Sequence, residues 1–396
     1  MSPPLHIGVL TGRVAYPNGM AGAQRIHLMA RAMAAAGAMV NVWVDGQDSA
    51  TEVRNLNAIG TKDGIPYEHL LGRTQASRYK LRRVCDRIAL ALATRRRMAA
   101  AVHSQSLDGL YFYTPCSDFD FERFVVRNIA RKTNLPVVLD LREAPWTLKQ
   151  KPSLVEKMAS PLFGADGVIC ISRFLKDWVH QENKRTAKNV RTLYVPILVD
   201  INEIALAEST PPQKVVLFAG SPGYDETFRF LLSVMEKVWA KHADCQLVIT
   251  GGTTEATFGA AAKSQNKKIR YAGFVDRPAL LREYTAASVL AIPLFDDIRS
   301  QARFPTKLGE YLASGRPVVT NRVGEIPHFL EAGVSACITE PGDIPAYAEA
   351  ICRLLGNPTI GHAMGRAGRQ VALKEFHYAN YGAQLCDFFV KQLHPK

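Results

Sequence analysis

The sequence lacks several features that would place it in a special class of protein. No apolar run approaches the roughly 18 residues that a membrane-spanning helix needs. The amino terminus, Met1 to His6, has no basic stretch followed by an apolar one, so it does not predict a signal peptide. The seven cysteines are scattered without a CxxC pair, which argues against a zinc ribbon or a disulfide framework and favours reduced thiols in a cytoplasmic protein.

Periodicity is absent as well. The 28 glycines and 22 prolines follow no repeat, which excludes collagen-like architecture. Hydrophobic residues make up 47% of the chain and charged residues 21%, as in globular proteins with buried cores. Because 396 residues are too many for one ordinary core, two domains are expected.

Acidic residues are few relative to basic ones: 36 Asp and Glu stand against 49 Lys and Arg, giving a net charge of +13. The segment Arg73–Arg97 holds nine basic residues and a single acid, Asp86. Apolar residues recur in it at helical spacing, at Leu81, Val84, Cys85, Ile88 and Leu92. This pattern predicts a basic amphipathic helix, which either packs on its domain as a solvated helix or contacts a membrane surface or another polyanion. No nucleic-acid-binding motif accompanies the charge, so no nucleic acid partner is expected.

Short apolar runs alternate with amphipathic stretches along the chain, the α/β pattern of mostly parallel sheets. In the first half, strands are expected at 5–10, 40–44, 110–114, 137–141, 167–171 and 191–195. A linker-like stretch, 208–213, then precedes a second series, expected at 215–219, 246–250, 269–272, 289–293, 317–320 and 336–338. Each half therefore predicts a Rossmann-like domain, with the boundary near residue 208.

One glycine-containing turn follows the first strand of each half. Gly19 lies in the loop before the first helix, which is expected to open at Gly22, and Gly220 and Ser221 follow the strand at 215–219. Small residues at such turns let backbone N–H groups approach a phosphate or sugar. Each turn alone is more often an ordinary turn, but the pair would face each other across an interdomain cleft.

The most informative stretch is 304–320. Lys307 falls in the first turn of a helix expected to start at Pro305, and Glu310 lies one turn further on. A lysine directed at phosphate beside a carboxylate directed at ribose hydroxyls suits a nucleoside diphosphate. The alternative is a surface salt bridge between the two residues, which their spacing equally allows.

This stretch, together with 324–328 and 340–343, resembles the nucleotide-binding region of family 4 glycosyltransferases with the GT-B fold. Other matching segments occur in the expected order, at 19–28, 167–175, 195–200, 216–220, 246–252 and 269–274. The resemblance implies two Rossmann-like domains facing a cleft, an acceptor-binding domain (1–207), a nucleotide-sugar-binding domain (208–375) and a C-terminal helix (376–396) that crosses back to the first domain.

The resemblance also implies an activity: metal-independent transfer of a hexose, with retention, from a UDP-sugar or GDP-sugar to a glycan or lipid-linked acceptor, without a separate cofactor. Glu310 matches the family's ribose-binding glutamate. The other residues expected to bind the donor nucleotide are Gly220, Ser221, Gly251, Phe274, Lys307 and Leu308. Lys307 and Arg303 are the expected catalytic cations, Glu143 is a candidate base, and Gly19 and Gly22 form the expected acceptor or phosphate loop.

The sequence departs from the family pattern at several positions. The glutamate expected eight residues before Glu310 is replaced by Ala302. Ser221 and Glu226 stand where basic residues are usual, and no histidine occurs in the segment 111–115. Three basic residues are candidates to replace the lost charge: Arg303, Lys307 and Arg229.

Three alternatives are open, of which the departures favour only the non-catalytic one. Asp118 and Asp120 spell the DxD motif of metal-dependent transferases, although they also suit a helix cap. A non-catalytic sugar-nucleotide-binding protein and a GT-B epimerase are the other two. For a transferase acting in polysaccharide biosynthesis, the basic segment Arg73–Arg97 predicts a cytoplasmic protein held peripherally on the inner face of a membrane.

Overall fold

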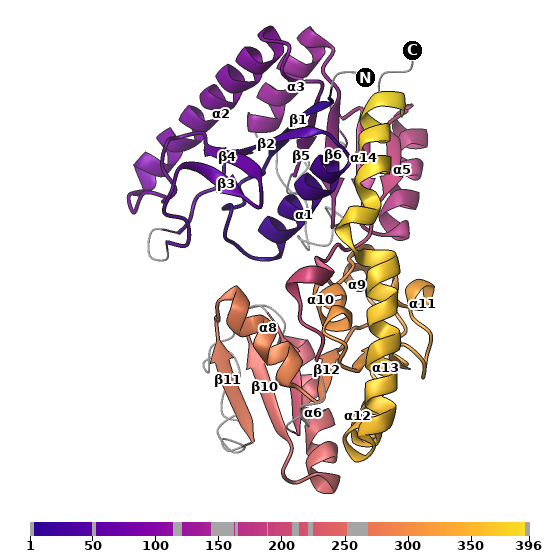
Figure 1. The fold of residues 1–396 in the computed structure, drawn as a ribbon. Helices are drawn as coiled ribbons and strands as arrows, with labels where there is room; N and C mark the ends of the chain where they lie inside the picture. The colour runs from indigo at the N-terminus through magenta and orange to yellow at the C-terminus, as the bar shows by residue number, and fades with distance from the viewer. Residues whose placement is uncertain are drawn as a thin grey trace. The chain divides into compact units, whose positions relative to one another are not determined.

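The computed structural model describes residues 4–49, 53–113, 121–143, 162, 165–187, 189–207, 214–220, 225–251 and 268–392, and every structural statement below concerns these residues. The chain divides into two compact units (Figure 1). The first unit comprises Met1–Leu198, Ala302–Phe304 and Tyr378–Lys396, and the second comprises Val199–Gln301 and Pro305–His377.

The chain enters the second unit at Val199, nine residues before the position expected from the sequence. The reason is that residues 199–207 are paired along the second unit. The Val199 N–H donates to the carbonyl of Phe376 (2.8 Å), and the Ala207 N–H donates to that of Ser314 (2.9 Å). The linker-like residues 208–213 lie outside the described ranges.

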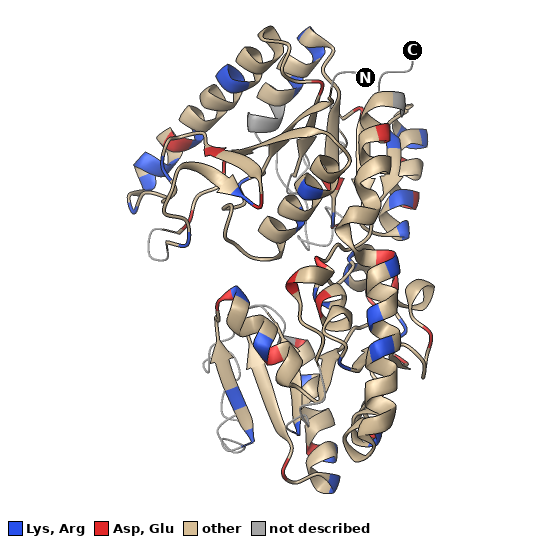
Figure 2. Cartoon of the chain, viewed as in Figure 1, with Lys and Arg blue, Asp and Glu red and all other residues tan. Residues whose placement is uncertain are grey.

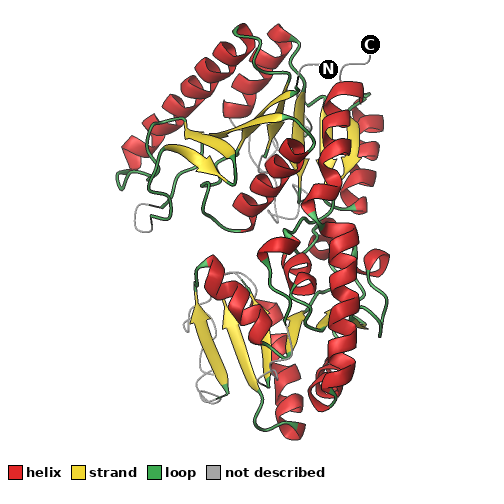
Figure 3. Cartoon of the chain, in the orientation of Figure 1, coloured by secondary structure: helices red, strands yellow, loops and turns green. Residues whose placement is uncertain are grey.

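The first unit is built on an eight-stranded sheet in the order β3-β4-β2-β1-β5-β6-β7-β8 (Figure 3). Neighbouring strands are parallel except for β3, which runs antiparallel to β4. The strands are β1 (His6–Leu10), β2 (Met39–Val44), β3 (Ile59–Lys62), β4 (Ile65–His69), β5 (Gly109–Phe112), β6 (Val137–Leu141), β7 (Gly167–Cys170) and β8 (Arg191–Tyr194).

The β3–β4 hairpin was not expected. Its turn is Asp63-Gly64, and both residues have positive φ, 48° and 79°. That geometry is the two-residue turn that matches the twist of a hairpin, and Asp-Gly is a strong sequence signal for it. The hairpin adds a short edge to the parallel sheet.

The second unit contains a six-stranded sheet in which all neighbours are parallel, in the order β11-β10-β9-β12-β13-β14. This is the Rossmann order, in which the strand sequence reverses direction between β9 and β12. The strands are β9 (Val215–Ala219), β10 (Gln246–Thr250), β11 (Ile269–Gly273), β12 (Val289–Ile292), β13 (Val318–Asn321) and β14 (Cys337–Thr339). The expected α/β class with two parallel-sheet domains is confirmed.

Helices connect the strands and cover separate apolar cores in the two units. Several begin at side-chain caps: Ser172, Asp276 and Asp343 each accept a hydrogen bond from a backbone N–H three residues on. The helices are α1 (Ala21–Ala35), α2 (Lys80–His103), α3 (Phe121–Thr133), α5 (Arg173–Thr186), η2 (Ile201–Glu203), α6 (Asp225–Lys241), α8 (Arg277–Ala286), α9 (Ile298–Ala302), α10 (Lys307–Ala313), α11 (Ile326–Phe329), α12 (Ile344–Gly356), α13 (Pro358–Val371), η3 (Ala372–Phe376), η4 (Tyr378–Tyr381), α14 (Gly382–Asp387) and η5 (Phe388–Gln392).

Candidate functional site

The point where the second sheet reverses direction is formed by the carboxyl ends of β9 and β12, which is where open α/β sheets bind ligands. Gly220 follows β9 directly, and its N–H donates to the carbonyl of Thr250 (3.0 Å). Gly251, after β10, has φ +115°, and a Cβ added there would lie 1.7 Å from the Gly220 carbonyl oxygen. Only glycine fits at position 251, so this edge of the sheet presents bare backbone.

Helix α10 is tied to the same edge of the sheet. The Ala219 N–H, at the end of β9, donates to the Tyr311 hydroxyl (2.8 Å). This contact ties α10, the helix that also carries Lys307 and Glu310, to the residue that precedes Gly220. Leu308, in contrast, is fully buried, and its N–H donates to the Pro305 carbonyl (2.9 Å), so its side chain packs in the core.

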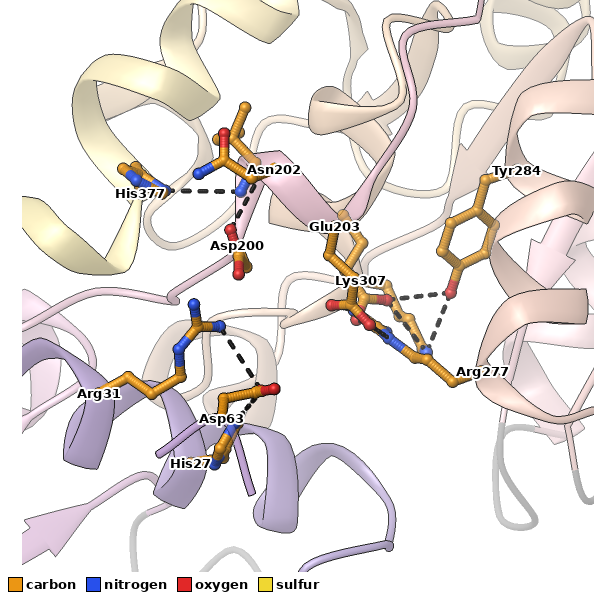
Figure 4. Close-up of polar contacts among 12 residues, drawn as sticks. His27, Arg31, Asp63, Asp200, Asn202, Glu203, Arg277, Tyr284, Lys307 and His377 are labelled. Carbon is orange, nitrogen blue, oxygen red and sulfur yellow. Dashed lines mark hydrogen bonds and ion pairs between the residues drawn. The ribbon is translucent and has the colours of Figure 1, made fainter. Parts of the chain in front are cut away.

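Arg277, Tyr284 and Lys307 converge in a polar cluster (Figure 4). Glu310 is the residue that all three contact. Its carboxylate accepts hydrogen bonds from the Tyr284 hydroxyl (3.0 Å) and the Lys307 ammonium (3.3 Å), and a third from the Arg277 guanidinium. Burial alone would raise the pKa of Glu310, but the charges of Lys307 and Arg277 lower it to about 2. The carboxylate is therefore ionised at neutral pH and fully engaged.

The sequence analysis did not identify Arg277 as a candidate site residue. It begins α8, and its guanidinium bridges Glu310 to Glu203 of η2, with two bonds of 2.8 Å to the latter. No sequence spacing relates these residues, because they come from segments some 30 to 100 positions apart. The cluster thus holds two carboxylates and two cations, and its charges balance.

Tyr284 and Phe274 complete this side of the second unit. Burial, reinforced by the charge of Glu310, raises the pKa of Tyr284 well above its usual value, so the hydroxyl remains a donor. The Lys307 ammonium contacts this hydroxyl at 3.0 Å. Phe274 follows β11 and is 56% exposed.

The other expected catalytic residues lie in the first unit. Arg303 pairs with Glu143 at 2.9 Å, and both side chains are about one-third exposed. The carbonyl of Ala302 accepts a hydrogen bond from the buried Ser172 hydroxyl (2.7 Å). The structure thus assigns Arg303 to a different unit from Lys307 and gives Glu143 a cationic partner. Arg142, the sequence neighbour of Glu143, has its guanidinium 3.5 Å from the centre of the Tyr113 ring.

Gly19 lies in the loop that follows β1 of the first unit, and Gly22 lies in the first turn of α1. A Cβ on Gly22 would lie 2.9 Å from the Tyr113 hydroxyl, and one on Gly19 would lie 2.8 Å from the Ala15 carbonyl oxygen. The Asn18 N–H donates to the side chain of Asn55 (2.7 Å). Small residues are therefore required where this loop passes the end of β5.

Side-chain contacts that run from the buried Tyr16 and His27 to the exposed Asp63 hold the same loop. His27 of α1 contacts the Tyr16 hydroxyl through Nδ1 (2.8 Å) and the Asp63 carboxylate through Nε2 (2.7 Å), and Arg31 lies beside Asp63 (Figure 4). Because a carboxylate only accepts, Nε2 carries the proton and Nδ1 accepts from Tyr16. Burial lowers the pKa of His27 to about 4 despite the opposing bond to Asp63, so the imidazole is neutral.

The basic segment forms α2, on which basic residues are spread along the ribbon (Figure 2). Its apolar stripe does not pack on the domain: Leu81 is 84% exposed, and Val84, Ile88 and Leu92 are 45–56% exposed. The helix is buried instead through Leu90, Ala91, Thr94, Met98 and Ala101. Arg73 pairs with Asp86, and Arg97 pairs with Glu68 and lies over Trp43. The exposed face therefore combines positive charge with apolar side chains.

Some expected features fall on residues that are not described, namely Ser221 and the pair Asp118 and Asp120. Within the described ranges, no group of three or more His, Cys, Asp and Glu side chains is arranged to hold a metal ion. Also within them, no helix combines the length and the apolar character needed to cross a bilayer. Glu226 and Arg229 are exposed on α6.

Residues 213–357 match the family model described as glycosyl transferases group 1. Among curated relatives, a GDP-mannose-dependent monoacylated alpha-(1-6)-phosphatidylinositol monomannoside mannosyltransferase of Corynebacterium glutamicum is 27% identical over 160 residues, 39% of this chain and 41% of that protein. The matches to the first curated relatives span about half of their length or less.

Solved structures match along nearly the whole chain. Sucrose-phosphate synthase from Thermosynechococcus elongatus superposes with a TM-score of 0.71 at 17% identity, covering 99% of this chain and 100% of that one. Anabaena HepE, solved with UDP and glucose, gives 0.66 at 14% identity, covering 97% and 98%. The narrower assignment to family 4 stays a prediction. Residues 213–357 thus form a group 1 glycosyltransferase domain, in a chain with the fold of the GT-B glycosyltransferases.

Proposed function

We propose that this protein is a retaining glycosyltransferase that moves a hexose from a nucleoside diphosphate donor to a hydroxyl of a glycan or lipid-linked acceptor. One observation carries the proposal: Tyr311, the neighbour of the ionised Glu310 on α10, is hydrogen-bonded to Ala219, which directly precedes the bare-backbone turn of Gly220. A carboxylate can accept both hydroxyls of a ribose, and exposed backbone N–H groups suit a diphosphate.

Donor binding requires Glu310 to exchange partners. In the structure its oxygens are occupied by Arg277, Tyr284 and Lys307. A ribose diol that takes over these bonds would release the Lys307 ammonium toward the diphosphate, while Arg277 would keep its two bonds to Glu203. We infer that Lys307 is the cation for the leaving diphosphate, since negative charge grows there as the glycosidic bond breaks.

This scheme uses protein cations in place of a metal ion and needs no separate cofactor. Glu143 is retained as a candidate base for the acceptor hydroxyl, and its ion pair with Arg303 would have to open or reorient first. Arg303 is then a counter-ion for that base. The Gly19–Gly22 loop, packed against Tyr113, is our candidate contact for the acceptor.

The transferase is favoured over the non-catalytic and epimerase alternatives because the domain match and the matching curated relatives are all named as transferases. The donor base is open between UDP and GDP: the Corynebacterium relative is named for GDP-mannose, and HepE was solved with UDP.

The test uses labelled UDP-glucose and GDP-mannose, with release of labelled sugar to water as the readout when no acceptor is supplied. We expect slow hydrolysis of one donor class by the wild type and loss of it in Glu310→Gln. Equal turnover by both proteins, or conversion of the donor to an epimer, would contradict the proposal.

We further propose that α2 holds the first unit on an anionic membrane, close to its acceptor. Its exposed face displays Leu81, Val84, Ile88 and Leu92 among basic residues, and each basic residue near such a surface contributes about 1 kcal/mol. Vesicle co-sedimentation should require anionic lipid and weaken with added salt. Arg82, Arg83, Arg95 and Arg96 are the residues to replace by Gln, since Arg97 also contacts Glu68 and Trp43. Salt-insensitive binding would overturn this proposal.

A further inference from the structure

A pocket of about 670 Å³ opens in the first unit at the start of α2. It is formed by the turn that leads into α2 and by residues 56–58, which precede β3. These segments are distant in sequence from Gly19 and Gly22. Its lining residues are Leu56, Ala58, Gly72, Arg73, Thr74, Gln75, Ala76, Ser77, Arg78, Tyr79 and Arg82. The volume is in the range of sites that bind small molecules.

The pocket is cationic. Three arginines line it and no acidic residue does. Arg73 is neutralised by its ion pair with Asp86. Within the described part of the chain, neither Arg78 nor Arg82 has an ion-pair partner, so two guanidinium charges are uncompensated at the pocket wall. Guanidinium groups bind phosphate through paired N–H donors, which makes a phosphate the matching ligand.

The surroundings of the pocket are apolar to an unusual degree. The four most exposed large hydrophobic side chains of the described residues are Leu56 (87%), Leu81 (84%), Tyr79 (77%) and Ile59 (74%). Leu56 and Tyr79 line the pocket itself, Leu81 precedes Arg82, and Ile59 follows Ala58. A soluble phosphate has no apolar group that could cover these side chains. An amphiphile whose phosphate enters the pocket would cover them with its apolar part.

The wall of the pocket is held in place by the rest of the unit. The Asp48 N–H donates to the Thr74 carbonyl (2.8 Å), and the Ala76 N–H donates to that of Asp48 (3.0 Å). The Asp48 carboxylate in turn accepts from the N–H (2.7 Å) and the amide (3.0 Å) of Asn55. Both sides of the pocket are thus joined through Asp48, and the site exists before any ligand binds.

We propose that this pocket binds the phosphate of an anionic lipid headgroup, with Arg78 and Arg82 on the phosphate and with Leu56, Tyr79 and Leu81 against the acyl-chain region. The inference rests on the proposed membrane association and deepens it, because it replaces a diffuse charge attraction with a defined site and a chemical class of ligand.

The probe is dihexanoyl phosphatidylglycerol, used as a monomer below its micelle concentration so that general surface charge plays no part. Titration calorimetry compares the wild type, R78Q/R82Q and a matched pair, R95Q/R96Q, which removes the same charge from exposed positions of α2 outside the pocket. Wild type and R95Q/R96Q should bind saturably and alike. R78Q/R82Q should bind weaker by on the order of 30-fold, since each basic contact is worth about 1 kcal/mol. R78K/R82K should recover only part of this loss, because lysine keeps the charge without the paired donors.

Unchanged melting curves for each variant exclude misfolding as the cause. Equal binding of the lipid by R78Q/R82Q and R95Q/R96Q would overturn the proposal that the pocket is the binding site. Co-sedimentation with anionic vesicles in that case would support only general attraction to the membrane surface. A second arm uses sn-glycerol 3-phosphate: affinity as high as for the lipid would exclude a lipid headgroup, because the apolar rim would then contribute nothing. Donor hydrolysis, measured in parallel, should be the same in all variants. Because it does not depend on lipid binding, it tests the glycosyltransferase proposal independently of the pocket.

Discussion

Acidification should loosen the first unit through His27. The imidazole is 2% exposed, and burial lowers its pKa from 6.5 to about 4. Between these two values the unfolded chain binds more protons than the folded one, so stability falls as pH drops. The contribution is fully present above pH 6.5 and is lost by about pH 4. The shift of roughly 2.5 pKa units corresponds to about 3 kcal/mol.

The assay is a urea series at pH 7.5, 6.5, 5.5 and 4.5, read by pulse-labelling hydrogen exchange of peptides from α1, which reports on the first unit alone. In His27→Gln the amide can replace both ring contacts without titrating, so the variant should lose about 2.5 kcal/mol less than wild type between pH 7.5 and 4.5. Burial also lowers the pKa of His69, so some dependence will remain in the variant. His180→Gln, an exposed position on α5, is the matched control and should follow the wild type. Identical pH dependence of wild type and His27→Gln would refute the assignment of a neutral, buried His27.

Three further predictions concern donor binding and turnover. Lys307→Ala should lower kcat more than it raises the donor KM, because a cation on the leaving group acts chiefly in the transition state; a change in KM alone would contradict this. Transferase activity should be unchanged in EDTA. Loss of activity on chelation, restored by Mn²⁺, would contradict the metal-independent scheme and favour metal binding by Asp118 and Asp120. Gly251→Ala should abolish nucleotide binding, because its Cβ would lie 1.7 Å from the Gly220 carbonyl oxygen. Gly342→Ala, at φ +79° with nothing within 4 Å, should cost only the backbone strain of about 1–2 kcal/mol; equal effects at the two positions would show that crowding is not the cause.

The parallel sheets were predictable because their strands are short apolar runs between amphipathic segments. Three expected strands, at 137–141, 215–219 and 246–250, have the same bounds in the structure. The hairpin of β3 and β4 was missed, because Gly60 and Pro66 weaken its strand pattern and its Asp63-Gly64 turn was not weighed. A local turn signal was present there and would have identified it.

The candidate site was only partly predictable. Lys307 and Glu310 are three residues apart on one helix, so their contact follows from helical spacing. The contacts of Glu310 with Arg277 and of Arg303 with Glu143 join distant segments, and they depend on tertiary structure that spacing does not encode. The same holds for α2: periodicity shows that an apolar stripe exists, but only packing decides that Leu90 and Met98 are buried while Leu81 and Val84 are exposed.

The central claim is that Glu310 binds the donor nucleotide, and titration calorimetry with UDP and GDP tests it most directly. Wild type should bind one of the two, and Glu310→Gln should bind that nucleotide weaker by about 1.5–3 kcal/mol, the usual worth of a hydrogen bond to a charged group. Glu349→Gln, an exposed glutamate of the same unit paired with Lys241, is the matched control and should bind like the wild type. Wild-type affinity in a Glu310→Gln protein that melts as a folded chain would remove Glu310 from the donor site and with it the observation on which the proposed function rests.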